Sequence, residues 1–189
     1  MHNIDIKNLT GKCLISMPTT DDHFAGTVVY VCSHKDNEGA MGFIVNKRVK
    51  DFSFQDLTSE LPWNFGDVPP PISLYDGGPL ERSKGFILHS DEYCPTESLN
   101  TGGGIAVSSS LSVLHDIAIG QGPKQRIIAL GYAGWAPKQL ETEIANNLWL
   151  VAESSPELIF GGNDETKWQR AIASLGIDFY NLAPNYGHS

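Results

Sequence analysis

Cysteine is scarce in this sequence, and long apolar runs are absent from it. The 189 residues include three cysteines, Cys13, Cys32 and Cys94, and their odd number and irregular spacing are typical of free thiols in a reducing compartment. No run reaches the roughly 20 apolar residues that a membrane-spanning helix needs, and the first residues lack the pattern of a secretory signal. We therefore expect a cytoplasmic protein that does not associate with a membrane.

Basic residues are also few. The chain has 13 Lys and Arg residues against 22 Asp and Glu residues, so its net charge is −9. Nucleic-acid binders gain much of their affinity from a basic surface that neutralises phosphates, so direct binding to nucleic acid is disfavoured. The one basic cluster, Lys47, Arg48 and Lys50, is followed at once by Asp51, which favours a solvated loop. A DNA-binding regulator that uses this cluster is the weakest of three functional hypotheses.

The sequence lacks the short motifs of common enzyme and metal sites. It has no nucleophile elbow, no phosphate-binding loop and no dinucleotide fingerprint. Zinc ligands usually come in two closely spaced pairs, whereas Cys32 and His34 form one loose pair with only His89 and Cys94 to add. The carboxylates that precede Cys94 disfavour its thiolate. We therefore predict no metal, no cofactor and no catalytic residue.

The chain has the length and the apolar content of one domain. Hydrophobic residues make up 41% of the sequence, an ordinary share for a compact fold, and 189 residues are close to the size of one typical domain. We predict a single domain over residues 1–189, with a short variable tail from about residue 177. Three consecutive prolines within residues 62–71 favour an extended surface loop inside that domain.

Short runs that are rich in β-branched residues predict strands. The strongest run, 27–32, is apolar almost throughout and is therefore expected to be buried on both faces. Turn residues at 36–39 predict a hairpin that joins it to 41–46. Further strands are predicted at 13–17, 72–75, 85–89, 105–107, 126–130 and 149–151.

Helical patterns alternate with the later strands. Leu140, Ile144 and Leu148 recur every four residues, which predicts a helix with Pro137 at its first position. A hairpin first and alternating helices later predict a mixed sheet in an α+β or α/β fold. The other predicted helices are 54–61 after a capping-box-like Ser53, 109–119 ended by Gly120, 156–160, and a last helix from Asn163 or Asp164 to Gly176.

The segment 130–137 carries the densest set of candidate binding residues. It is predicted to join a buried strand to a helix start. Gly131 and Gly134 permit a close backbone approach, and Tyr132 and Trp135 supply flat apolar faces with polar tips. This composition suits the rim of a small binding site. It also suits a packed corner of the fold, which is the more common case.

A second corner lies between two predicted strands. Gly77, Gly78 and Pro79 predict a tight bend or bulge in which backbone N–H groups face outward. Asn46 stands at the end of a predicted strand. We expect these residues to share one binding surface with those of 131–135.

Several of these segments resemble the AlgH/YqgE family of bacterial proteins. The resemblance rests on residues 11–18, 27–34, 39–47, 85–90 and 130–135, and it extends in order over about residues 8–176. It implies an α+β fold in which a bifurcated mixed β-sheet with a small barrel-like part is surrounded by helices. It supplies no catalytic residue and no cofactor. Most members are uncharacterised, and one branch is linked to transcriptional regulation of alginate synthesis.

The leading hypothesis is a non-enzymatic protein that binds a partner protein or a small ligand and that acts on transcription, if at all, through another protein. The alternative is an enzyme that acts on a small anionic metabolite at 131–137, with His34 or His89 as the proton carrier. No pattern in the sequence indicates an oligomeric state or the identity of the partner.

Overall fold

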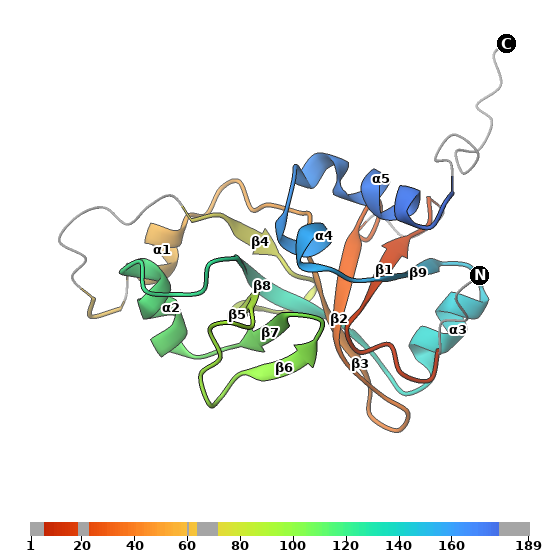
Figure 1. Cartoon of the computed structure of the whole chain (residues 1–189), viewed down its shortest axis with the longest axis horizontal. Coiled ribbons are helices and arrows are strands. Elements are labelled where there is room, and N and C mark those ends of the chain that lie inside the picture. Colours follow the sequence, from red (N-terminus) through yellow and green to blue (C-terminus); the bar gives the residue numbers. More distant parts are fainter. Residues whose placement is uncertain (1–5, 19–22, 60, 64–71, 178–189) are drawn as a thin grey trace, which may run out of the picture.

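The computed structural model describes residues 6–18, 23–59, 61–63 and 72–177. Within them the chain forms an α+β fold of one nine-stranded sheet and five helices (Figure 1). The strands are β1 (Lys12–Ser16), β2 (Val28–Lys35), β3 (Gly39–Ile44), β4 (Leu74–Asp76), β5 (Leu80–Ser90), β6 (Leu99–Gly102), β7 (Ile105–Ser108), β8 (Arg126–Trp135) and β9 (Trp149–Glu153). The helices are α1 (Phe54–Thr58), α2 (Leu111–Ala118), α3 (Gln139–Ala145), α4 (Pro156–Phe160) and α5 (Asp164–Ser174).

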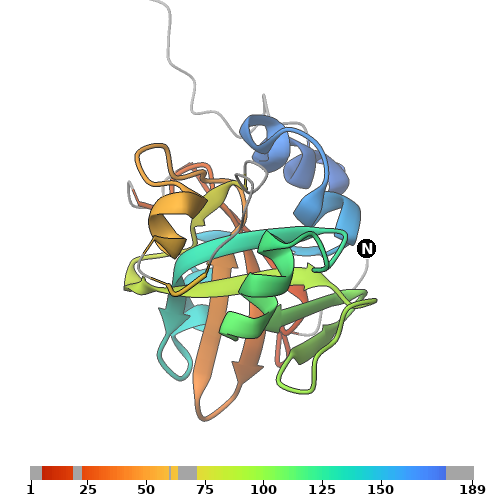
Figure 2. The same cartoon turned by 90° about the vertical axis from the view of Figure 1, so that its left-hand side faces the viewer.

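Strand β8 divides the sheet into two halves. The strand order is β6-β7-β5-β8-β3-β2-β1-β9, and β4 pairs with β8 off this path. The first half of β8 lies beside β5 and β4, and its last residues pair with β3. The β4–β8 pair is parallel and the others are antiparallel, so the sheet is mixed, as predicted. Figure 2 shows β2 and β3 running across the direction of β5 and β8, because the sheet curls into a half-barrel.

Gly131 marks the point at which the sheet branches. Its φ of +72° is a left-handed conformation that side chains disfavour. A Cβ built on Gly131 would lie 2.6 Å from the carbonyl oxygen of Leu80 and 2.7 Å from that of Gly78. The bend therefore depends on a residue with no side chain, because the backbone of residues 78–82 occupies the space.

Strand β2 shows why the core has two sides. Val28 and Tyr30 belong to the cluster inside the half-barrel, which α4 and α5 also line, and Val29 and Val31 belong to the cluster beneath α3. All four are fully buried, which confirms the prediction of a strand buried on both faces. A third cluster lies between α1, α2 and the other face of β5 and β8.

Most of the local signals in the sequence act as predicted. The β2–β3 hairpin forms, and Ser53 and Asp56 make the capping box of α1. Ser155 and Asn163 cap α4 and α5. Residues 64–71 of the predicted proline-rich loop and residues 178–189 of the predicted tail lie outside the described residues.

The predicted loop at 131–137 is wrong in its extent. Strand β8 continues to Trp135, because Ala133–Trp135 pair with Ala40–Gly42 of β3, a contact between residues far apart in the sequence. Pro137 precedes α3 and is not its first residue, and Lys138 occupies the N-cap position with φ +65°. Helix α1 ends at Thr58, three residues before the predicted end, and the sequence reading missed β6 entirely.

Candidate functional site

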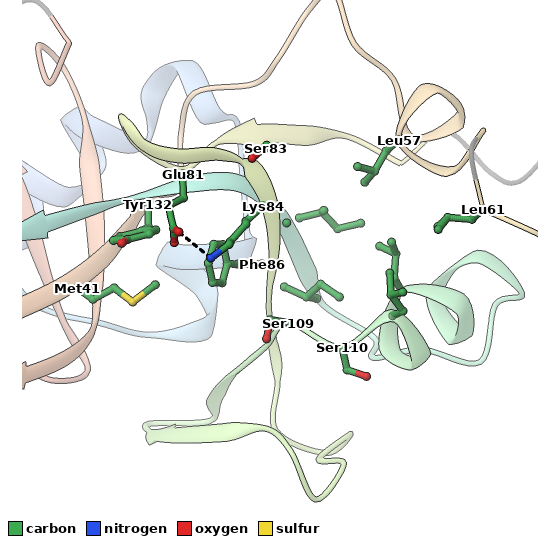
Figure 3. A pocket seen from close by; sticks show the side chains of 15 residues that line it. Met41, Leu57, Leu61, Glu81, Ser83, Lys84, Phe86, Ser109, Ser110 and Tyr132 are labelled. Carbon is green, nitrogen blue, oxygen red and sulfur yellow. Dashed lines mark hydrogen bonds and ion pairs between the residues drawn. The ribbon is translucent and has the colours of Figure 1, made fainter.

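A groove of about 640 Å³ opens beside the branch of the sheet. It runs along β5 from the side chains of β3 and β8 at one end to α1 and α2 at the other (Figure 3). Its lining is mainly apolar. This size and this lining are typical of sites that bind small molecules.

Three strands supply one end of the groove. Met41 comes from β3, Phe86 from β5 and Tyr132 from β8, and all three side chains are half-buried. The rings of Phe86 and Tyr132 meet edge to face with 5.8 Å between centroids, and Phe86 also packs on the buried Phe43 at 5.2 Å. The groove is therefore lined at the branch by the rings of Phe86 and Tyr132, and Phe43 packs behind Phe86.

Two short helices form the opposite end. Leu57 and Leu61 come from α1 and the turn after it, and Leu111 and Leu114 come from α2. Leu111, the first residue of α2, is 58% exposed, which is high for a leucine. Ser110 caps the helix beside it by accepting a hydrogen bond from the N–H of Ser112.

A bulge in β5 gives the groove its charged rim. Leu80 pairs with Tyr132 and Gly85 with Leu130, so five steps along β5 match two along β8. Within this bulge Glu81 has φ +45°, a strained conformation for a residue other than glycine. Its carboxylate forms an ion pair of 2.6 Å with Lys84, and Figure 3 shows this pair between Tyr132 and Phe86. The hydrogen bond that Lys84 donates to Glu81 raises the pKa of Lys84.

The structure brings the predicted glycine corners together. A Cβ on Gly77 would lie 2.4 Å from the carbonyl oxygen of Gly131, and a Cβ on Gly78 would lie 2.2 Å from the carbonyl carbon of Tyr132. The two corners therefore pack against each other, with Pro79 leading into β5. Of the predicted site residues, Tyr132 lines the groove.

Trp135, Gly134 and Asn46 lie outside the lining of the groove. Trp135 is buried in the cluster beneath α3. Gly134 faces the side chain of Leu80, since a Cβ on it would meet that side chain at 2.8 Å. Asn46 accepts a hydrogen bond from the N–H of Val28 and donates one to the carbonyl of Gly26, so its amide links two neighbouring segments. A binding role for these residues stays a prediction.

Both candidate histidines are buried and hydrogen-bonded within the protein. Nδ1 of His34 accepts from the N–H of Leu9 at 3.1 Å, and its Nε2 lies 3.4 Å from Glu141. The two ring nitrogens of His89 contact the carbonyl of Ser90 and the hydroxyl of Ser108. Neither histidine lines the groove.

The sequence reading missed most of the groove. The sequence predicts Met41 and Phe86 only as strand residues, and it predicts no role for Glu81 and Lys84. The available signal is the polar run 81–84, which lies between Leu80 and the predicted strand at 85. That run indicates a bulge, but only the pairing with β8 shows where it lies.

Several of the other candidate groups have structural partners or are buried. Lys47 donates to the carbonyl of His23, and Arg48 forms an ion pair of 2.5 Å with Asp164. Burial raises the pKa of Cys13 and of Cys32 to about 12. Within the described ranges, no His, Cys, Asp and Glu side chains form a group of three or more suited to a metal ion, and no helix is long and apolar enough to span a membrane.

Comparison with known proteins agrees with this architecture. Residues 13–180 match the family model described as AlgH-like. A UPF0301 protein of Jannaschia sp. (strain CCS1) is 43% identical over 185 residues, which are 96% of each chain. The solution structure of the AlgH protein from Pseudomonas aeruginosa superposes with a TM-score of 0.75 at 34% identity over the whole of both chains. The crystal structure of protein DIP2367 from Corynebacterium diphtheriae shares the fold, with a TM-score of 0.70 at 20% identity over 91% of this chain and 88% of that one.

These observations place the chain in the α+β class, with a sheet that is branched and curled. The chain belongs to the AlgH-like family, whose relatives among these matches carry the name UPF0301. This confirms the resemblance seen in the sequence.

Proposed function

We propose that the protein is a binding protein without catalytic activity, and that its groove takes a small molecule with an apolar body and a polar end. One observation carries the proposal: an apolar groove of about 640 Å³ has an ion pair, Glu81 with Lys84, on its rim. An apolar lining favours burial of the body, and the few polar groups orient the end.

The free energies of burial and association favour an amphipathic ligand over a purely apolar one. A ligand that removes about 200 Å² of apolar surface from water gains about 5 kcal/mol at about 25 cal/mol per Å². Association costs about 4 kcal/mol or more in lost freedom. Apolar contact alone therefore leaves little net affinity. The remainder must come from the rim, where Lys84, Glu81 and the hydroxyl-bearing Ser83 are placed to meet a polar group.

We further propose that any effect on transcription passes through a protein partner. Two of the three cations in the basic cluster, Lys47 and Arg48, already bind a backbone carbonyl and Asp164, and Lys50 is the third. A net charge of −9 opposes approach to a polyanion. The buried free thiols Cys13 and Cys32 fit a reducing compartment, so we place this activity in the cytoplasm.

The test uses the full chain and three probes, decanoate, decylamine and decanol, which share one apolar chain and differ in head group. We expect amide shifts in NMR spectra at residues of the groove, and the preferred head group identifies whether Lys84 or Glu81 orients the ligand. Leu111→Glu should weaken binding about tenfold, because it puts a charge against the apolar body.

Leu99→Glu is the matched control, since Leu99 is also an exposed leucine, at 51%, but lies on β6 outside the groove. Binding in this variant should equal that of the unmodified chain. The proposal fails if none of the three probes shifts groove residues, or if the two variants weaken binding equally.

A further inference from the structure

A second, polar cleft of about 320 Å³ lies at the beginning of β4 and β8. These two strands pair in parallel, with Leu74 opposite Ile128, so the segments that enter them run side by side. Ser73 and Tyr75 line the cleft from the β4 side, and Phe160 closes it from the end of α4. The cleft shares only Ile128 with the groove, so its polar groups belong to a separate site.

The cleft differs in charge from the rest of the protein. Its lining contains Lys124 and Arg126 and no carboxylate, although the chain as a whole carries −9. Across the described part of the chain, neither cation forms an ion pair, whereas many others do. Glu92 accepts a hydrogen bond from the backbone N–H of Lys124, but it does not line the cleft.

The wall behind the cleft adds no net negative charge. The hydroxyl of Tyr75 donates to Asp164 at 3.0 Å. That carboxylate is already balanced by two cations, Arg48 at 2.5 Å and Lys167 at 3.0 Å. The charges at and behind the lining therefore sum to a positive value, which favours an anion in the cleft.

Arg126 is held in a fixed orientation. Its Nη1 donates to the carbonyl of Pro123 at 3.0 Å, and the residue is half-buried at the first position of β8. A guanidinium that is tied at one nitrogen retains other donors in a planar fork, which suits the oxygens of a phosphate or carboxylate. Phe160, Ile72 and Ile128 supply apolar surface on the same cleft.

We propose that this cleft binds the phosphate or carboxylate group of a small organic anion, with Arg126 and Lys124 on the anionic group and Phe160 against its carbon body. The site is additional to the proposed ligand groove and does not depend on it. It also differs from the segment 131–137, where the sequence alone suggested an anionic metabolite.

The experiment titrates the full chain with phenyl phosphate, benzoate, inorganic phosphate and phenol at constant ionic strength, followed by amide shifts in NMR spectra. We expect shifts at 72–75, 124–126 and Phe160. Phenyl phosphate or benzoate should bind more tightly than inorganic phosphate, and phenol should not bind. The comparison of the two aromatic anions distinguishes a phosphate ligand from a carboxylate ligand.

Two variants test the cations. Arg126→Gln should weaken the binding of the preferred anion about tenfold or more, as expected for loss of a charge-assisted hydrogen bond. Lys124→Gln lies at an exposed position, and its ammonium forms no ion pair with the described residues. This variant should weaken binding less and keeps the test valid if Arg126→Gln does not fold. Lys35→Gln removes a cation from the β2–β3 hairpin and should leave binding unchanged.

Three results would overturn the proposal. One is the absence of shifts at the cleft for both aromatic anions at about 10 mM, where even weak sites fill. Another is equal weakening by Lys35→Gln and Lys124→Gln, which would show a general charge effect. The third is binding of phenol as tight as that of phenyl phosphate.

Discussion

Trp135 and Trp149 donate their indole N–H groups to the same atom, Oε2 of Glu143, each at 2.8 Å. Their rings meet edge to face at 5.9 Å. The two tryptophans belong to β8 and β9, which are separated in the sheet by β3, β2 and β1. One carboxylate on α3 thus links β8 and β9, the first and last strands in the order β8-β3-β2-β1-β9. Trp135, which the sequence offers as a candidate for ligand contact, has this structural hydrogen bond.

This arrangement predicts the effect of changing Glu143. Glu143→Ala leaves two indole donors without their acceptor and should lower the free energy of unfolding by about 2–4 kcal/mol. Glu143→Gln keeps an acceptor oxygen and should cost less. Urea denaturation measures both. Glu38→Ala, which removes an exposed hairpin carboxylate paired with Lys35, should change stability by less than about 1 kcal/mol. Equal costs for Glu143→Ala and Glu38→Ala would contradict the prediction.

Gly131 and Gly176 offer a second matched comparison. Both have φ +72°, but a Cβ on Gly176 meets none of the described residues within 4 Å, whereas one on Gly131 meets two carbonyl oxygens. Gly176→Ala should therefore cost about 1 kcal/mol, the penalty of the left-handed conformation alone. Gly131→Ala should cost about 3 kcal/mol or more, because the backbone must also move. Thermal denaturation of the two variants checks this order, and similar melting temperatures would refute it.

The depressed pKa of Asp164 should make the free energy of unfolding depend on pH in acid. Burial tends to raise the pKa of this carboxyl, but hydrogen bonds from Arg48 and Lys167 outweigh burial and hold the pKa below its ordinary value. A depressed pKa stabilises the folded state above the ordinary value, near 3.8, and this contribution is lost as the pH falls through that value and the lower folded one. Asp164→Asn should thus cost most at neutral pH, and its cost should shrink below about pH 4. A pH-independent cost, measured by urea denaturation, would be the contrary result.

The three thiols should differ in reactivity. Cys13 and Cys32 are buried, and burial raises the pKa of each to about 12, so neither presents a thiolate at neutral pH. Cys94 is exposed. We expect one thiol to react quickly with a disulfide reagent in the folded protein and all three to react in denaturant. Cys94→Ser should abolish the fast reaction. Fast reaction of a second thiol in the folded state would show that the core opens.

The same two thiols predict a loss of stability in alkali. Their folded pKa values lie above the ordinary value of 9.0, so the protonated thiols stabilise the folded state below that pH. The contribution is lost as the pH rises from about 9 toward about 12. The variant Cys32→Ala should show a shallower decline than the unmodified chain when unfolding is followed between these values.

Local chemistry explains which elements the sequence predicted well. The capping residues Ser53 and Ser155 act on donors within the next three residues, so their pattern can be read in a short window. The same holds for Gly120, whose positive φ ends α2. Successive side chains of β2 point to opposite faces of the sheet. Because the run is apolar at nearly every position, the sequence predicted that both faces are buried.

Elements that depend on distant partners were not predictable in this way. The extension of β8 to Trp135 requires pairing with β3, about 90 residues earlier in the chain. The bulge that carries Glu81 and Lys84 is defined only against β8. The groove itself combines side chains from β3, α1, β5, α2 and β8, so no single segment contains its pattern.

The sequence by itself determined the class of fold and the acidic character of the chain, because periodicity and caps act over a few residues and charge follows from composition alone. Its motifs carried the resemblance to the AlgH/YqgE family. It also indicated that the glycines at 77, 78 and 131 permit close backbone approach. Only the tertiary structure decided that these glycines pack on one another, that Trp135 binds Glu143, and that the groove opens beside them. The physical reason is that a site assembled by a branching sheet depends on which strands become neighbours, and that choice is made by the whole core.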